Sequence, residues 1–135
     1  MKKLYQNTVF ILALLFLIPA LGRNDYPQAE ELEIHLLSKK KWVGVWEYTV
    51  SDVPPEYTNG ELHVTKSGRE YQVELVLEYG KIPAQSVVLK SKTLYFEVDI
   101  DGMQIEITLN RVDDTVSGEV SSPDGVFFLE GERKE

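Results

Sequence analysis

The sequence predicts an all-β fold, an eight-stranded antiparallel up-and-down β-barrel, and three observations lead to it. From Trp42 onward, apolar and polar residues alternate, as in strands with one buried face and one exposed face. Residues that tolerate tight or left-handed backbone recur about every eleven positions, the spacing of all-β sandwiches and barrels. Nearly every connection is as short as a hairpin, and a meander of eight strands removes its two free edges by closing on itself.

Each strand is bounded by turn chemistry and has one apolar face. In the third strand, for example, Tyr71, Val73 and Leu75 share a face, while Gln72 and Glu74 share the other. The predicted strands are 43–50, 61–66, 70–78, 83–89, 93–100, 103–110, 115–121 and 126–132. The predicted turns are Asn59-Gly60, Ser67-Gly68, Tyr79-Gly80, Lys90-Ser91 (a weaker signal), Asp101-Gly102, Asp113-Asp114 and Ser122-Pro123-Asp124-Gly125.

Residues 1–22 have the pattern of a signal peptide. A positively charged start precedes the uncharged apolar run 9–21, and Ala20-Leu21-Gly22 offers small residues to a signal peptidase. The pattern predicts export to the periplasm or outside the cell, cleavage near Gly22 and no stable membrane anchor after cleavage. A retained anchor is the alternative, but the run is shorter than the ~20 apolar residues that a spanning helix needs, and it contains Pro19.

Residues 23–41 predict a short helix or linker before the barrel domain, which occupies 42–135. Pro27 suits a first helical turn, acidic residues follow it, and Lys39, Lys40 and Lys41 stand where the helix dipole favours cations. This pattern predicts a helix over about 28–39. A partly ordered tether is the alternative.

Charge and composition exclude several partners and kinds of site. The formal net charge of −8 becomes more negative by two once Lys2 and Lys3 are removed with the signal peptide. A surface this acidic repels phosphate backbones, so nucleic acid is not an expected partner, and an anionic membrane surface is unfavourable for the same reason. The absence of cysteine rules out disulfides and thiolate metal sites.

No catalytic or metal-binding pattern is visible, so the sequence predicts neither an enzyme nor a cofactor. His35 and His63 are isolated, and a hairpin turn explains Asp101-Gly102 without calcium. There is no G-x-S-x-G elbow and no phosphate-binding glycine loop. A hydrolase or isomerase built in a barrel mouth remains a minor alternative.

Gly44-Val45-Trp46, on the first strand, resembles the G-x-W signature of the lipocalin and wider calycin barrels. As a whole, the chain resembles the short lipocalin-like β-domains of exported bacterial proteins more closely than it resembles true lipocalins. The resemblance implies that Trp46 packs across the closed end of the barrel, with Arg133 (or Lys134) lying against its ring. Gly44 would permit the sharp bend that such a barrel needs.

Whether the barrel holds a ligand is left open by the sequence. Eight strands enclose just enough space for either a filled core or one small ligand, and the inward residues are mostly large. A cavity would open away from Trp46, beside the 51–58 loop, with Tyr57 as a lid or packed on the rim. The predicted ligand-binding residues are Tyr48, Tyr57, Tyr71 and Phe96.

Two functions therefore compete. The first is a non-enzymatic exported barrel that binds a small apolar or amphipathic ligand. The second is a filled β-domain that serves as an interaction module for another exported protein or a surface polymer, through a patch that could include Val76, Tyr95 or Phe128.

Overall fold

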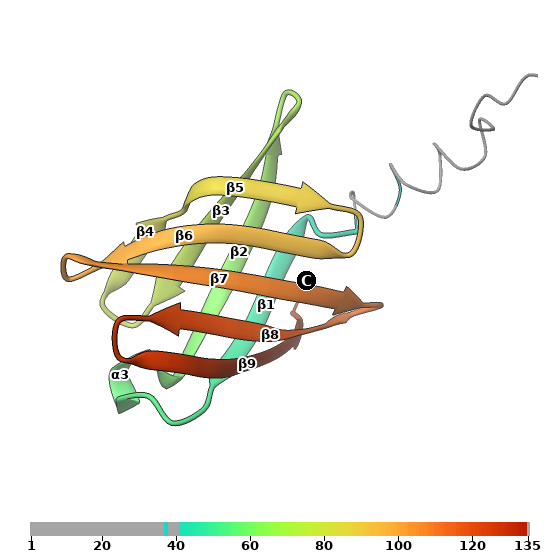
Figure 1. Ribbon diagram of the computed structural model, residues 1–135. Helices are drawn as coiled ribbons and strands as arrows, with labels where there is room; N and C mark the ends of the chain where they lie inside the picture. Colours follow the sequence, from blue (N-terminus) through green and yellow to red (C-terminus); the bar gives the residue numbers. More distant parts are fainter. Residues whose placement is uncertain (1–36, 38–40, 135) are drawn as a thin grey trace, which may run out of the picture. The chain divides into compact units, whose positions relative to one another are not determined.

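The computed structural model describes Leu37 and residues 41–134 (Figure 1). The predicted signal peptide 1–22, and all but two residues of the predicted helix or linker 23–41, lie outside the described residues. Within the described part, no helix is long and apolar enough to span a membrane.

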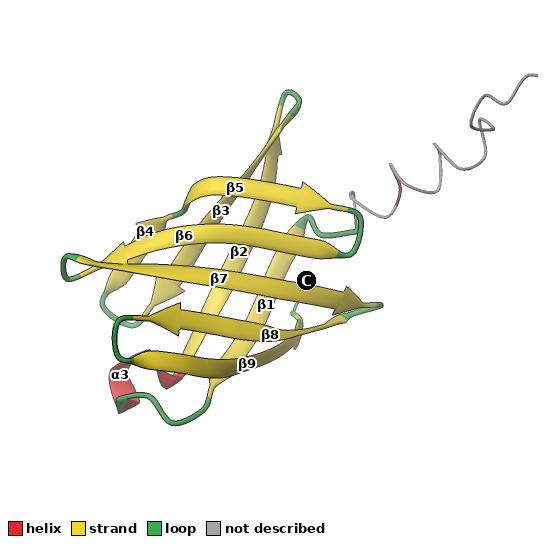
Figure 2. Cartoon of the chain, in the orientation of Figure 1, coloured by secondary structure: helices red, strands yellow, loops and turns green. Residues whose placement is uncertain are grey.

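Residues 44–133 form one antiparallel sheet of nine strands, with a short helix between the first two strands (Figure 2). The prediction of an all-β antiparallel barrel is confirmed, and the predicted count of eight strands is wrong. The strands are β1 (Gly44–Val50), β2 (Asn59–Ser67), β3 (Glu70–Leu77), β4 (Gly80–Pro83), β5 (Gln85–Lys90), β6 (Thr93–Ile100), β7 (Met103–Val112), β8 (Thr115–Ser122) and β9 (Gly125–Arg133). The helix is α3 (Pro55–Thr58).

The first and last strands are hydrogen-bonded to each other. β1 pairs with β2 on one side and with β9 on the other, and the strand order is β4-β3-β2-β1-β9-β8-β7-β6-β5. Trp46 stands opposite Leu62 on β2 and opposite Arg133 on β9. The first and last strands therefore lie side by side in the middle of the strand order, and the two edge strands are β4 and β5.

The extra strand, β4, precedes the predicted strand 83–89 and shares only Pro83 with it, whereas β5 covers most of that prediction. β4 pairs with β3, whereas β5 pairs with β6, so the chain changes partner halfway along the barrel. Pro83 has no N–H to donate to a second neighbour. The backbone of Ser86 is left-handed, at φ 52°, and the register of β5 shifts between Gln85 and Val88. β4 and β5 together make one traverse, and the barrel is nearly closed, with a seam between them.

The predicted turn at Asn59-Gly60 is wrong, because both residues lie inside β2. Residues 51–58 make the reversal from β1 instead. Gly60 stands opposite Tyr48, and a Cβ at Gly60 would overlap the Tyr48 hydroxyl oxygen. The glycine thus accommodates a neighbouring ring rather than a turn. By contrast, the predicted hairpin at Asp101-Gly102 is present, with φ values of 54° and 83°.

Two indoles close the end of the barrel where β1 begins. Trp42 and Trp46 are both fully buried, with ring centroids 5.7 Å apart. The Trp46 Nε1 donates to the Trp42 carbonyl oxygen at 2.9 Å, and the Trp42 Nε1 donates to the Ser91 carbonyl oxygen at 3.0 Å. The G-x-W pattern indicates Trp46 alone, and Trp42 is the second half of this plug.

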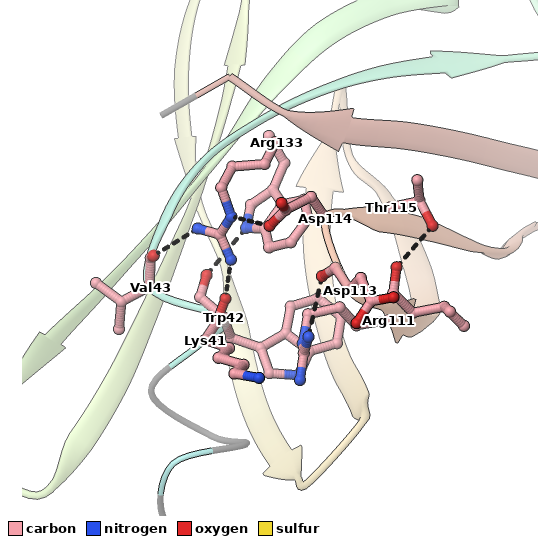
Figure 3. A network of polar contacts seen from close by, with 10 residues as sticks. Lys41, Trp42, Val43, Arg111, Asp113, Asp114, Thr115 and Arg133 are labelled. Atoms are coloured by element: carbon pink, nitrogen blue, oxygen red, sulfur yellow. Dashed lines mark hydrogen bonds and ion pairs between the residues drawn. The ribbon is translucent and has the colours of Figure 1, made fainter.

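Arg133 covers the plug from the outside (Figure 3). Its guanidinium carbon lies 4.2 Å from the centroid of the Trp46 ring, within the range of a cation–π contact. The same guanidinium donates to the carbonyl oxygens of Lys41 and Val43 and pairs with Asp114 Oδ1 at 2.9 Å. Gly44 has φ 142°, a conformation that residues with a Cβ rarely adopt, and it lets the chain turn from the first indole into β1.

Candidate ligand pocket in the barrel mouth

The barrel has a closed end and a mouth, because alternate connections of a meander lie at opposite ends. The closed end holds the plug and the turns at 68–69, 91–92 and 113–114. The mouth is formed by residues 51–58, with α3, and by the turns at 78–79, 101–102 and 123–124. In Figure 1, α3 lies beside the connection between β8 and β9.

An apolar cavity of about 170 Å³ lies in the mouth. All of its lining residues are apolar or aromatic except Ser122 and Asp124. They are Tyr48, Val50, Val53, Pro54, Tyr57, Leu75, Leu77, Ile100, Met103, Ile105, Ile107, Val120, Ser122, Asp124, Phe127 and Leu129. The lining contains no Lys, Arg or His.

Tyr48 forms the floor of this pocket. It also lines a void of only about 10 Å³ beneath it, together with Trp46, Leu62, Phe96 and other buried side chains. The barrel is therefore filled from the indole plug up to Tyr48 and hollow above it. The filled core that the sequence left as one alternative is present below Tyr48, and an open apolar cavity lies above it.

The Tyr48 ring fits because both neighbouring strands carry glycine opposite it, Gly60 on β2 and Gly131 on β9. The side chain is 6% exposed, and its hydroxyl has no hydrogen-bond partner among the described residues. Burial raises the pKa of this hydroxyl, so it stays protonated at neutral pH. The pocket floor thus offers one neutral group that can both donate and accept a hydrogen bond.

Tyr57 reaches across the mouth from α3. The helix begins after Pro54 and contains a single turn, in which the Tyr57 N–H donates to the Pro54 carbonyl oxygen at 2.9 Å. The Tyr57 hydroxyl then donates to Asp101 Oδ2 at 3.0 Å, on the turn between β6 and β7. This hydrogen bond raises the pKa of the Tyr57 hydroxyl, so the contact persists at neutral pH.

Of the four residues predicted to bind a ligand, the structure brings Tyr48 and Tyr57 together in the pocket. Phe96 is fully buried and lies below Tyr48. Tyr71 lies at the closed end, near the start of β3, where the Lys66 Nζ is 5.5 Å from its ring centroid. Tyr71 lines a groove along the seam, with Val73 and Val87 among its neighbours.

Alternation along the strands assigns Leu75, Leu77, Ile105, Ile107 and Phe127 to the interior, and all five line the pocket. It did not show which end of the barrel each occupies. Strand direction would have shown it, because successive strands of a meander run in opposite directions. Residues near the end of a strand that runs toward the mouth lie beside residues near the start of the next strand, which runs away from it. Leu75 and Leu77 are late in β3 and thus near the mouth, whereas Tyr71 is early.

A cluster of polar side chains also lies on the outer wall of the barrel, where Glu61 and His63 on β2 are close to Lys134. His63 Nε2 lies 2.8 Å from Glu61 Oε2, and Lys134 Nζ lies 2.6 Å from Glu61 Oε1. The hydrogen bond from His63 lowers the pKa of Glu61 the most, and the hydrogen bond from Lys134 lowers it further. The described residues contain no group of three or more His, Asp or Glu that could hold a metal ion.

Solved β-barrels share this fold. A redesigned β-barrel matches with a TM-score of 0.54 and 15% identity, over 73% of this chain and 96% of that one. Secretory abundant heat soluble protein 4 from Ramazzottius varieornatus matches with a TM-score of 0.49 and 14% identity, over 71% of this chain and 96% of that one. A mutant of the fluorescent protein UnaG matches with a TM-score of 0.48 and 14% identity, over 71% and 98%.

No family model matches the sequence, and no curated protein matches it either. At these identities, the likeness to the redesigned barrel supports the fold alone. The function has to be inferred from the pocket.

Proposed function

We propose that this protein is a non-enzymatic barrel that binds a small apolar molecule, or the apolar end of an amphiphile, in the mouth pocket. The observation that carries the proposal is an open apolar cavity above an otherwise filled interior. Apolar surface gains free energy when a ligand removes it from water, and small-molecule sites are typically concave and mostly apolar.

The cavity volume limits the ligand. At about 170 Å³, the pocket is smaller than the ~300 Å³ from which drug-sized sites begin. It is close to the ~150 Å³ of a cavity that holds one benzene ring. The buried part of the ligand is therefore a single ring or a chain of about six carbons. Burying six methylene groups contributes about 5 kcal/mol, and association costs of ~4 kcal/mol or more oppose it, which predicts binding weaker than about 1 mM for so small a ligand.

The polar groups of the lining support binding rather than catalysis. The Ser122 Oγ accepts from the Asp124 N–H at 3.2 Å and donates to the Gly125 carbonyl oxygen at 3.4 Å, so it holds its own turn. Tyr57 is engaged with Asp101. The described lining contains no His or Lys, and the hydrogen bonds of Ser122 Oγ go to the backbone rather than to a carboxylate that could act as its base.

We also propose that the chain is exported and cleaved near Gly22, on the sequence pattern of residues 1–22. The mass of the amino-terminal peptide, measured on protein recovered from the exported fraction of its host, tests this directly.

The alternative role, an interaction module, has one feature in its favour. Val126 and Phe128 lie on the outer face of β9 and are 62% and 50% exposed. Their cross-strand partners are Ser121 and Glu119, and Glu130 follows on the same face, so the apolar patch is small and bordered by charge. Large apolar patches mark binding surfaces, and this one is modest. We therefore place ligand binding first.

The proposal predicts that filling the pocket abolishes binding. Hexan-1-ol is a neutral probe of the right size, and its dissociation constant can be measured by two-dimensional NMR titration. We expect saturable binding to the unaltered protein and binding at least about tenfold weaker to Ile105→Trp, because the indole occupies the cavity that Ile105 lines. Circular dichroism will show whether the variant keeps the barrel fold.

Val112→Trp is the matched control. Val112 is 68% exposed at the closed-end terminus of β7, so the same side chain is added far from the mouth. Its affinity for hexan-1-ol should equal that of the unaltered protein. Equal affinity of a folded Ile105→Trp variant, or no saturable binding to the unaltered protein, would refute the pocket as the site.

A further inference from the structure

The basic residues of the barrel are concentrated at its closed end, whereas acidic residues lie at both ends and dominate the mouth. The connections that form the mouth carry six acidic residues and, within 51–58, 78–80, 99–102 and 122–125, no Lys, Arg or His. The six are Asp52, Glu56, Glu78, Asp99, Asp101 and Asp124. None of them forms an ion pair with another described residue. Their charges are therefore uncompensated around the opening.

Basic residues gather at the opposite end. Eight of the nine Lys and Arg residues that the structure describes lie at or beside the closed-end turns and chain ends, namely Lys41, Lys66, Arg69, Lys90, Lys92, Arg111, Arg133 and Lys134. The ninth, Lys81, lies near the mouth at the start of β4, where its Nζ is 3.7 Å from Glu74 Oε1. This uneven distribution of charge gives the mouth a negative electrostatic potential. The net charge of the chain alone does not reveal it.

Two of the acidic residues adjoin the pocket itself. Asp124 is part of its lining, and Asp101 accepts the hydrogen bond of the pocket residue Tyr57. Charges of one sign around an apolar hollow focus the field into it, because the low-dielectric walls screen poorly. A charged ligand head at the rim meets this field at short range.

The pocket lining contains no positive charge that would attract an anion against this negative potential. The lining has no cationic side chain, and the hydroxyl of Tyr48, whose side chain lines the floor, is neutral. A carboxylate or phosphate head would face acids at the rim with no cation to pair with. An ammonium head would find carboxylate acceptors there, while its apolar part filled the hollow.

We propose that the mouth pocket is selective for cationic amphiphiles, primary amines that carry a single ring or a short alkyl chain. This inference rests on the proposed function and names the ligand class of the same site. The ammonium group binds at the rim, near Asp101 and Asp124, and the apolar part lies against Tyr48, Ile105 and Phe127.

Three probes of equal chain length test the selectivity: hexylammonium, hexan-1-ol and hexanoate, titrated at pH 7 and followed by NMR. We expect hexylammonium to bind about tenfold or more tighter than hexanoate, with hexan-1-ol between them. Salt screens exposed charges, with a Debye length of ~10 Å at 0.1 M and ~3 Å at 1 M, so the ratio should shrink toward one in 1 M salt.

Charge-removal variants locate the effect. The double variant Asp101→Asn with Asp124→Asn should reduce the ratio at least threefold, and asparagine tolerates the φ of 54° at position 101. Glu119→Gln removes one charge from the exposed outer wall of β8 and should leave the ratio unchanged.

The outcomes separate the two proposals. If hexan-1-ol binds but hexylammonium binds no tighter than hexanoate, the cationic selectivity is wrong and the apolar pocket stands. If the double variant keeps the full ratio, the rim acids are not its source and the inference is equally overturned. If none of the three probes binds, the proposed function fails, and the selectivity fails with it.

Discussion

Trp46→Ala should lower the free energy of unfolding by about 4 kcal/mol, because it removes the larger part of the plug. Truncating a buried Trp typically costs ~3–5 kcal/mol. Trp46 is fully buried, its Nε1 donates to Trp42, and Arg133 stacks on its ring, so neither neighbour can close the gap without losing its own contacts. For a domain of this size the melting temperature should fall by roughly 20 °C. Urea denaturation and calorimetry measure both quantities.

Tyr79→Ala is the matched control for deleting an aromatic side chain. Tyr79 is 74% exposed at the mouth, and a surface truncation there should change the unfolding free energy by no more than ~0.5 kcal/mol. Trp46→Phe should lie between the two, since it keeps a ring beneath Arg133 and loses the hydrogen bond to Trp42. A loss below ~1 kcal/mol for Trp46→Ala would show that the indole does not seal the barrel.

Gly118→Ala should be nearly as damaging, at about 3 kcal/mol or more, although it adds only one methyl group. A Cβ at Gly118 would overlap the Thr108 carbonyl oxygen and would lie 3.0 Å from the Leu109 Cα, both on the neighbouring strand β7. These are backbone atoms of a paired strand, so relief requires that β7 and β8 separate around the Leu109–Gly118 pair. Urea denaturation of the variant gives the cost.

Gly68→Ala separates steric overlap from backbone strain. Gly68 has φ 62° in the β2–β3 turn, and a Cβ there would meet nothing within 4 Å. Only the left-handed conformation then opposes alanine, at ~1–2 kcal/mol. If Gly118→Ala cost no more than Gly68→Ala, the close approach of β7 and β8 would not be the reason for glycine at position 118.

Much of the fold was predictable because side-chain alternation and turn residues act locally. Asp101-Gly102 specifies its own hairpin whatever surrounds it, and the alternation of Leu94, Phe96 and Val98 assigns these residues to the interior, where all three are buried. The turn predicted at Asn59-Gly60 was wrong because an Asn-Gly pair has the same sequence whether it forms a turn or lies within a strand. The ring of Tyr48, twelve residues earlier in the chain, makes Gly60 necessary.

The division into β4 and β5 could not be read from alternation, since the apolar pattern runs through it. The change of partner depends on how the two edges of the sheet meet, which is a property of the closed structure. Pro83 was the available signal, because a proline within a predicted strand indicates an edge or a break.

The pocket was predictable in part. The position of the mouth relative to Trp46, and the proximity of Tyr57, follow from chain direction and loop length. Tyr71 was assigned to the same wall because it shares the inward phase of Leu75, but phase does not give height along the barrel. Composition also obscured the charge polarity. Sorting the charged residues by alternate connections would have shown an acidic mouth and a basic closed end.

A crystal structure of the protein grown with hexylammonium tests the central claim most directly. The fold and the pocket predict an alkyl chain in the mouth, enclosed by Tyr48, Ile105 and Phe127, with its nitrogen toward Asp101 and Asp124. A mouth filled by the protein's own side chains, or an alkyl chain bound only on the outer face of β9 beside Val126 and Phe128, would contradict it.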